Sequence, residues 1–142
     1  MADAIQVDVV SPEQVLFSGE ANMVVTRTLG GGEIAFQAGH QPFVGALVEN
    51  HTKIYLTDGT VQDIAVHRGF VEVSSGEITK ISVLTDKAEL AEDIDVERAK
   101  AALERHVYTI KDEEVETKIA DAISGKARAQ TRLKVTDTSF TA

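Results

Sequence analysis

The stretch "EDIDVERAKAALERH", residues 92–106, marks the point where the chain changes from strand-like to helix-like sequence. Ala99, Leu103 and His106 recur at intervals of three and four residues, as apolar positions do on one face of a helix. Asp93 stands where a helix N-cap is expected. The fold therefore divides close to this stretch, with strands before it and helices after it.

Turn-forming and charged residues change frequency at the same place. Both prolines and nine of the ten glycines lie before residue 87. Residues 1–86 carry 15 charged side chains, whereas the 56 residues that follow carry 22. A joint shift of this kind is typical of a domain boundary. We therefore predict two domains, residues 1–86 and residues 87–142.

The first part consists of short β-rich segments separated by turn signals every eight to ten residues. Segments such as "AIQVDVV" alternate apolar and polar residues, and Asp58-Gly59 and Ser75-Gly76 are turn pairs. This pattern favours an antiparallel β-sandwich or barrel. The triple glycine at 30–32 has the composition of a phosphate-binding loop, but no Lys-Ser/Thr follows it, which favours a hairpin loop.

The second part predicts two helices that fold back into a hairpin. The first carries Ala99, Leu103, His106 and Val107 on one face, and "VYTIKDEE" (residues 107–114) is the expected turn. Val115, Ile119, Ile123 and Leu133 are the expected apolar stripe of the second helix. Basic residues gather at its end, where a helix dipole favours cations. Both stripes are narrow, so we expect the hairpin to lean on another surface.

Composition excludes several classes of protein. The chain has 142 residues, 43% of them hydrophobic, with no cysteine and a formal net charge of −9. This balance argues against nucleic-acid binding, and the absence of cysteine rules out disulfides and thiolate metal sites. We expect no secretory signal, no membrane-inserted segment, no metal site and no catalytic residues, because no segment or spacing typical of them occurs.

The arginines of the helical part are the candidate functional residues. Asp95, Arg98 and Arg105 fall within about an 80° arc of the first helix, and Arg128 and Arg132 lie one turn apart on the second. Guanidinium groups that converge in this way would suit a phosphate, because each can donate two parallel hydrogen bonds. Spacing alone leaves two interpretations open, an anion site and a solvated or partner-facing surface.

The whole chain resembles the ε subunit of the F-type ATP synthase, the counterpart of the mitochondrial δ subunit. Three motifs carry the resemblance in the same order: "VDVVSPEQVLFSGEANMVV", "GGEIAFQAGHQPFVGAL" and "DIAVHRGFVEV". A helical hairpin follows them, as it does in that family.

The resemblance implies a ten-stranded antiparallel β-sandwich followed by two helices. It also implies a noncatalytic rotor subunit that couples proton-driven rotation of the c-ring to ATP synthesis. Its partners would be the γ subunit, the polar loops of the c-ring and, through an extended hairpin, the α/β catalytic ring. Such a subunit is peripheral, on the cytoplasmic face of the cell membrane, and its hairpin inhibits ATP hydrolysis.

The resemblance also implies two sets of functional residues. Glu33 and His40 match the family's loop positions that face the c-ring. No cofactor is required, but some members bind ATP as a regulatory ligand through Ile/Leu-Asp-x-x-Arg-Ala and further charged positions. The matching residues in this chain are Glu89, Ile94, Asp95, Arg98, Ala99, Arg105, Arg128 and Arg132.

The chain departs from the family pattern at residues 35–38 and at His67 and Arg68, where the family often has glycine in place of the arginine. These departures put the detailed c-ring contacts in question. Two other functions remain open from the sequence, a free-standing ATP-sensing protein on the same scaffold and a stand-alone sandwich binding domain with a helical tail.

Overall fold

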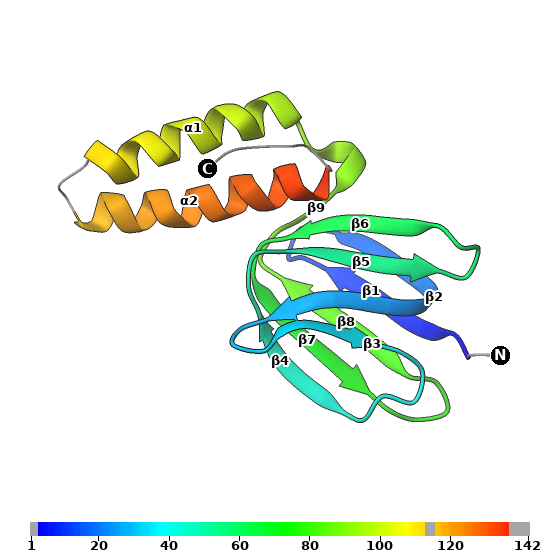
Figure 1. The fold of residues 1–142 in the computed structure, drawn as a ribbon. Coiled ribbons are helices and arrows are strands. Elements are labelled where there is room, and N and C mark those ends of the chain that lie inside the picture. The colour runs from blue at the N-terminus through cyan, green and yellow to red at the C-terminus, as the bar shows by residue number, and fades with distance from the viewer. Residues whose placement is uncertain (1–2, 113–115, 137–142) are drawn as a thin grey trace. The chain divides into compact units, whose positions relative to one another are not determined.

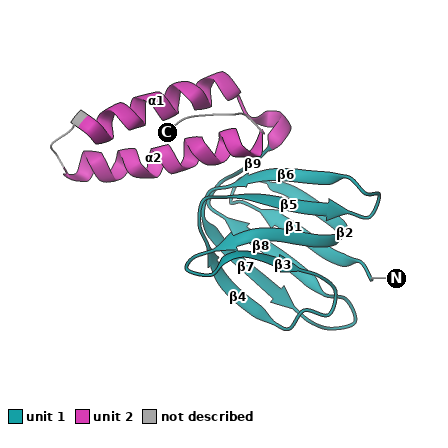
Figure 2. Cartoon of the chain, viewed as in Figure 1, with its two compact units in different colours: residues 1–90 teal, residues 91–142 magenta. Residues whose placement is uncertain are grey.

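The structure of the chain, a computed structural model, describes residues 3–112 and 116–136. It separates into two compact units, Met1–Leu90 and Ala91–Ala142 (Figure 2). The first unit extends beyond the boundary predicted at residues 86 and 87 because strand β9, Ala88–Leu90, pairs with β6. Val66 opposite Ala88 and Ile64 opposite Leu90 attach this last segment to the sheet.

The first unit is built from strands alone (Figure 1). Besides β9, the strands are β1 (Ile5–Val10), β2 (Val15–Thr28), β3 (Gly32–Phe36), β4 (Phe43–Leu47), β5 (Asn50–Leu56), β6 (Val61–Val66), β7 (Gly69–Ser74) and β8 (Lys80–Thr85). Their order in the sheet is β1-β8-β7-β4-β2-β5-β6-β9, with β3 paired to β2 and β1 also paired to β2. The sheet folds over into two layers (Figure 1).

The predicted sandwich is confirmed, but the expectation of ten antiparallel strands is wrong. Within the described residues there are nine strands, and β1 runs parallel to β8. The lower number reflects β2, a single strand of 14 residues that pairs first with β1 and then with β3 and β5. A register shift between Ala21 and Met23 in its pairing with β5 lets one strand serve both layers.

The core of the sandwich follows from strict alternation in the strands. Every second residue of β1 is fully buried, and β5, β7 and β8 alternate in the same way. Its fully buried side chains include Ile5, Val7, Val9, Val24, Phe36, Ile54, Ile64, Val66, Val71, Ile81 and Val83. Burying a branched or aromatic side chain of this size contributes roughly 1.5–3 kcal/mol.

The triple glycine forms a turn between two antiparallel strands, as predicted. Gly30 and Gly32 adopt φ angles of 77° and 73°, and Thr28 pairs with Gly32 across the β2–β3 ladder. Positive φ is the conformation that glycine adopts at little cost. The glycines therefore serve the hairpin geometry, and no helix begins after them.

The second unit contains helix α1 (Val96–Asp112) and helix α2 (Glu116–Val135), preceded by one 3-10 turn at Ala91–Asp93. Asp95, and not Asp93 as predicted, caps α1: the backbone N–H of Arg98 donates to its Oδ1 at 3.0 Å. The turn predicted at residues 107–114 is wrong for its first part. α1 continues through Val107 to Asp112 because Val107 still packs on the interhelical cluster.

The interhelical seam differs on the α2 side from the predicted stripe. Ile123 is 53% exposed, and the predicted Val115 lies outside the described residues. Leu133 is buried as predicted, but small residues occupy much of the rest of the seam: Ala122, Gly125 and Ala129. Small side chains let the two backbones approach closely. Neither helix has the length and apolar character needed to cross a membrane, as far as the described residues go.

Candidate functional site

The residues that the resemblance assigns to ATP fall in both units. Glu89 belongs to β9 of the first unit, whereas the other seven belong to the second. Ile94 and Ala99 are buried, and Ala99 packs in the seam. One carboxylate oxygen of Asp95 accepts the hydrogen bond that caps α1. The four arginines are the cationic side chains of this set.

The four arginines lie on one flank of the hairpin. Arg98 and Arg105 directly precede Ala99 and His106, which face α2, and Arg128 and Arg132 directly precede Ala129 and Leu133, which face α1. Each arginine is thus rotated by about 100° from the seam, in the same sense along its chain. The two helices are antiparallel, so along the chain one turns clockwise and the other anticlockwise for a viewer at one end of the hairpin. Rotations of the same size from two facing seam positions therefore bring all four arginines to the same side of the hairpin.

The register of the helices sets the arginines at two levels. The His106 ring packs against Gly125, and Ala99 and Leu103 share a cluster with Ala129 and Leu133. This register places Arg105 level with Arg128, and Arg98 level with Arg132. At 1.5 Å rise per residue, the two levels are separated by roughly 6–10 Å. The four arginines therefore form two pairs, one pair at each level.

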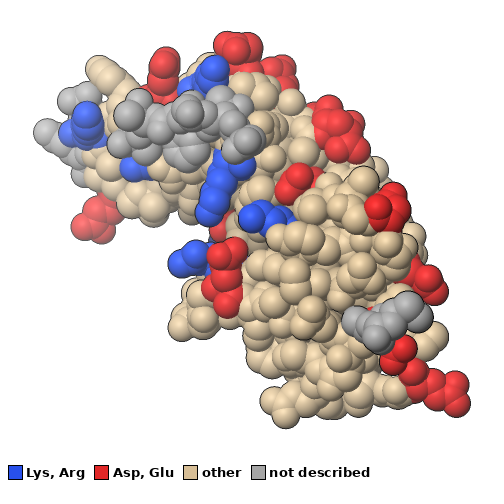
Figure 3. Space-filling model, turned by 45° about the vertical axis from the view of Figure 1, so that its right-hand side comes forward, with Lys and Arg blue, Asp and Glu red and all other residues tan. Residues whose placement is uncertain are grey.

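Three of these arginines are available to a ligand. Arg98, Arg105 and Arg128 form no ion pair with any residue that the structure describes, although the chain carries 23 acidic side chains. Figure 3 shows Lys and Arg side chains at the surface of the helical unit. Three unpaired guanidinium groups on one flank give a positive local potential in an acidic protein.

His106 belongs to the same environment. An added Cβ on Gly125 would lie 2.4 Å from Nε2 of His106, so the imidazole occupies the space that any larger residue would fill. Burial lowers the pKa of His106 below its ordinary value of 6.5, and the charges of Arg105 and Arg128 lower it further. Both arginines are thus close enough to act on the ring. The sequence pattern identified His106 as a seam residue but gave no sign of these neighbours.

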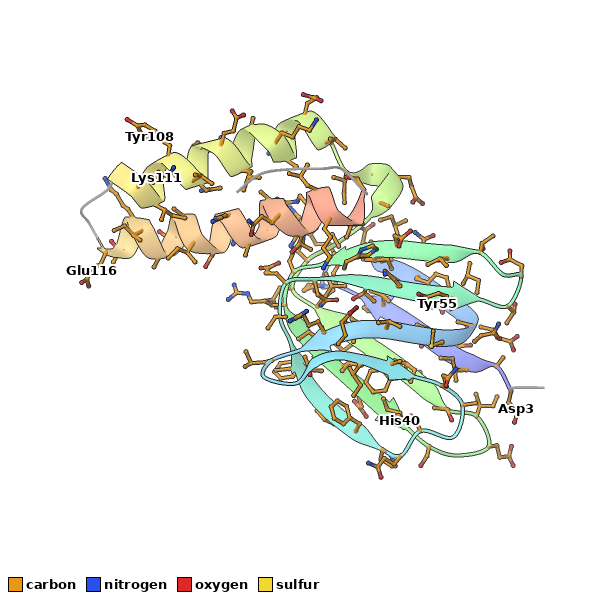
Figure 4. The ribbon with its side chains drawn as sticks, viewed as in Figure 1. Asp3, His40, Tyr55, Tyr108, Lys111 and Glu116 are labelled. Carbon is orange, nitrogen blue, oxygen red and sulfur yellow. The ribbon has the colours of Figure 1, made fainter. Side chains whose placement is uncertain are left out.

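Glu33 and His40 do not form one cluster. Glu33 is the second residue of β3 and stands opposite Arg27 of β2, whereas His40 follows the other end of that strand. The His40 ring, labelled in Figure 4, packs edge-on against Phe36 at a centroid distance of 4.9 Å. Its Nδ1 lies 2.7 Å from the carbonyl oxygen of Gln41. His40 therefore shapes the β3–β4 connection, and Glu33 remains exposed.

Sequence reasoning missed the surroundings of His67. This buried ring lies between two carboxylates, with Nδ1 2.7 Å from Glu49 Oε2 and Nε2 2.8 Å from Glu89 Oε1. A neutral imidazole can donate only one of these bonds, so both form together when the ring is protonated at both nitrogens. Glu89, assigned to ATP by the resemblance, is therefore engaged inside the first unit.

An apolar row crosses the outer face of one layer of the sandwich. The register places Val10, Leu84, Phe70 and Ala46 side by side on β1, β8, β7 and β4. Phe70 is 57% exposed and Leu84 49% exposed. Val10, Leu47, Phe70 and Leu84 line an adjoining depression of about 640 Å³. An exposed row of this kind is typical of a protein–protein contact.

No group of three or more His, Asp or Glu side chains that could hold a metal ion occurs among the described residues.

The chain matches the family model "ATP synthase, Delta/Epsilon chain, beta-sandwich domain" over residues 4–91. It belongs to this family. The match covers the whole sheet and ends where the helical unit begins.

Similarity to other members of the ATP synthase delta/epsilon family extends into the hairpin. The ATP synthase epsilon chain of Shouchella clausii is 37% identical over 131 residues, which are 92% of this chain and 93% of that protein. The epsilon chain of Streptomyces griseus is 41% identical over 104 residues, 73% of this chain and 81% of that protein.

The fold recurs in a chain of the cryo-EM structure of the Euglena gracilis mitochondrial ATP synthase (OSCP/F1/c-ring in rotational state 1). The TM-score is 0.70 at 18% identity, covering 94% of this chain and 78% of that one. At this identity the likeness concerns the fold alone.

Proposed function

We propose that this chain is the noncatalytic central-stalk subunit of an ATP synthase, peripheral to the membrane on its cytoplasmic face. In that place it couples proton-driven rotation of the c-ring to ATP synthesis. The observation that carries the proposal is the similarity to an ATP synthase epsilon chain over nearly the full length of both proteins, hairpin included. The sandwich would hold the chain on the rotor, with Glu33 and His40 toward the c-ring loops.

The apolar row Val10–Leu84–Phe70–Ala46 is the surface we assign to the γ subunit. Its exposed aromatic and aliphatic side chains would lose contact with water on docking, which supports a stable interface. It also gives the rotor proposal a residue-level consequence, since a polar side chain at the centre of the row should weaken the contact.

Purification of the tagged chain from the cells that make it tests this assignment. The wild-type chain is expected to recover γ and the α and β subunits, and Phe70→Ser to recover several-fold less of each. Ile78→Ser, at a residue 63% exposed outside the row, is the matched control and should behave as wild type. Recovery of the chain alone, without any synthase subunit, would reject the rotor proposal and favour a free-standing sensor.

The hairpin is the regulatory element in this proposal. Extended toward the α/β ring, it would block rotation in the hydrolysis direction; compact, it would permit it. ATP held by Arg98, Arg105, Arg128 and Arg132, beside Ile94, Asp95 and Ala99, would favour the compact form. It can do so only by the difference between its affinities for the two forms. Arg98, Arg105 and Arg128, which form no ion pair with any described residue and lie on one flank, support this assignment. Glu89 would contribute only by leaving His67.

Titration of ATP into the isolated chain measures this binding directly. Arg128→Ala is expected to remove most of the binding heat, because Arg128 lies level with Arg105 on the flank. Arg27→Ala, in β2 of the sandwich, is the control and should leave the heat unchanged. Equal heats for wild type and Arg128→Ala would reject the site.

A further inference from the structure

The role that we assign to the His106 ring rests on the proposed ATP site. The ring lies on the seam of the hairpin, against Gly125, and is only partly accessible to solvent. It makes no hydrogen bond with any residue that the structure describes. No buried side-chain nitrogen or oxygen among the described residues lacks a hydrogen-bond partner, so the unbonded ring nitrogens of His106 can be reached by solvent and by a small ligand.

Basic groups dominate the charges around this ring. Arg105 precedes it in α1, and Arg128 lies one turn beyond Gly125 in α2. Neither has an ion-pair partner among the described residues. Two further charged groups of α2 lie within one turn of Gly125: Asp121 and Lys126. The protonated ring would thus add a positive charge beside two unneutralised guanidinium groups.

We propose that His106 is a further anion-binding residue of this hairpin and makes its affinity for a nucleotide phosphate depend on pH. A phosphate held by Arg105 and Arg128 would neutralise the charges that now oppose protonation of the ring. His106 then takes up a proton and donates an N–H to the bound phosphate. No covalent bond is made or broken; one proton moves from solvent to the imidazole.

The sign of the effect follows from linkage. Without ligand, burial and the neighbouring arginines lower the pKa of His106 below 6.5, so the compact hairpin is weakened as pH falls. With phosphate bound, the protonated ring is stabilised, so phosphate binds more tightly as pH falls. ATP therefore protects the compact hairpin under mildly acidic conditions, where the hairpin without ATP is least stable.

The test is calorimetric titration of Mg-ATP into the full chain at about pH 6 and about pH 8, where histidine is the side chain that normally titrates. The affinity ratio between the two pH values is expected to be roughly 3- to 10-fold larger for wild type than for His106→Gln. Comparing variants removes the titration of the nucleotide itself. His51→Gln, at a histidine of the sandwich, is the matched control and should keep the wild-type ratio.

Titration of the wild type in two buffers with different ionisation heats gives a second readout that needs no variant. Uptake of a fraction of a proton beyond that expected for the nucleotide is predicted near pH 6. If wild type and His106→Gln show the same ratio of affinities between the two pH values, or if no extra proton is taken up, the role of His106 is overturned. The arginine site would not be affected by that result. No binding to wild type at either pH would overturn both.

Discussion

Replacing Gly69 with alanine is expected to destabilise the sandwich by on the order of 4 kcal/mol. Gly69 has a φ of 140°, which side chains of L-residues rarely adopt, and it opens β7 opposite Thr85 of β8. A Cβ at this position would lie 2.1 Å from the carbonyl oxygen of Leu84 and 2.7 Å from Cα of Thr85. Both are backbone atoms of the neighbouring strand, so relief requires β7 and β8 to separate.

Urea unfolding followed by circular dichroism measures this change. A loss of this size is a large share of the roughly 5–15 kcal/mol that stabilises an ordinary domain. Arg68→Gly is the matched control, because Arg68 is the adjacent residue at positive φ, 63°, and its side chain is exposed. The ion pair of Arg68 with Glu49 is long, at 3.9 Å, and exposed on the arginine side, so its loss costs little and glycine there should be neutral or stabilising. A typical single mutation changes the free energy of unfolding by about 1 kcal/mol. If the free energy of unfolding of Gly69→Ala lies within this range of the wild-type value, the close approach of β7 and β8 at Gly69 is contradicted.

Replacing His67 with alanine is expected to cost about 2–4 kcal/mol, because it removes the ring that lies within hydrogen-bond distance of both Glu49 and Glu89. Glu49 is 13% exposed and Glu89 is 22% exposed. The expected loss of stability is therefore smaller than for a fully buried pair. Glu89 belongs to β9, so its loss of a partner should also loosen the last strand before the helices.

His51→Ala is the control for this change. Among the described residues His51 has one carboxylate partner, Asp63 at 2.6 Å, and that carboxylate is 34% exposed. Its removal is expected to cost about 1 kcal/mol or less. Hydrogen exchange of the β9 amides should accelerate in His67→Ala and stay unchanged in His51→Ala. Equal losses of stability in both variants would mean that the second carboxylate contributes nothing.

Local patterns predicted the strands and the existence of two helices. Alternation in β1 and turn pairs such as Asp58-Gly59 are properties of neighbouring residues, and the structure retains both. Helix details were less predictable. Asp93 and Asp95 are equally good caps in sequence, and the direction in which the chain enters α1 selects Asp95.

The seam and the surroundings of His67 depend on contacts between distant segments. The apolar pattern predicts Ile123 in the seam, but Gly125 lies there instead, because a residue without a side chain leaves room for the His106 ring. Glu49 lies 18 residues before His67 and Glu89 lies 22 residues after it; the pairing of β5 with β6 brings Glu49 to the ring, and the pairing of β6 with β9 brings Glu89. Nothing in the spacing of these residues indicates a common contact.

The helical unit of this proposed rotor subunit is expected to restrain ATP hydrolysis. The most direct measurement is the ATP hydrolysis rate of the assembled synthase with the full chain and with a chain that ends at Leu90, the last residue of the sandwich unit. Both chains are expected to assemble, because the sheet is complete at Leu90, and the shorter chain is expected to give several-fold faster hydrolysis. Equal rates from two fully assembled enzymes would contradict it.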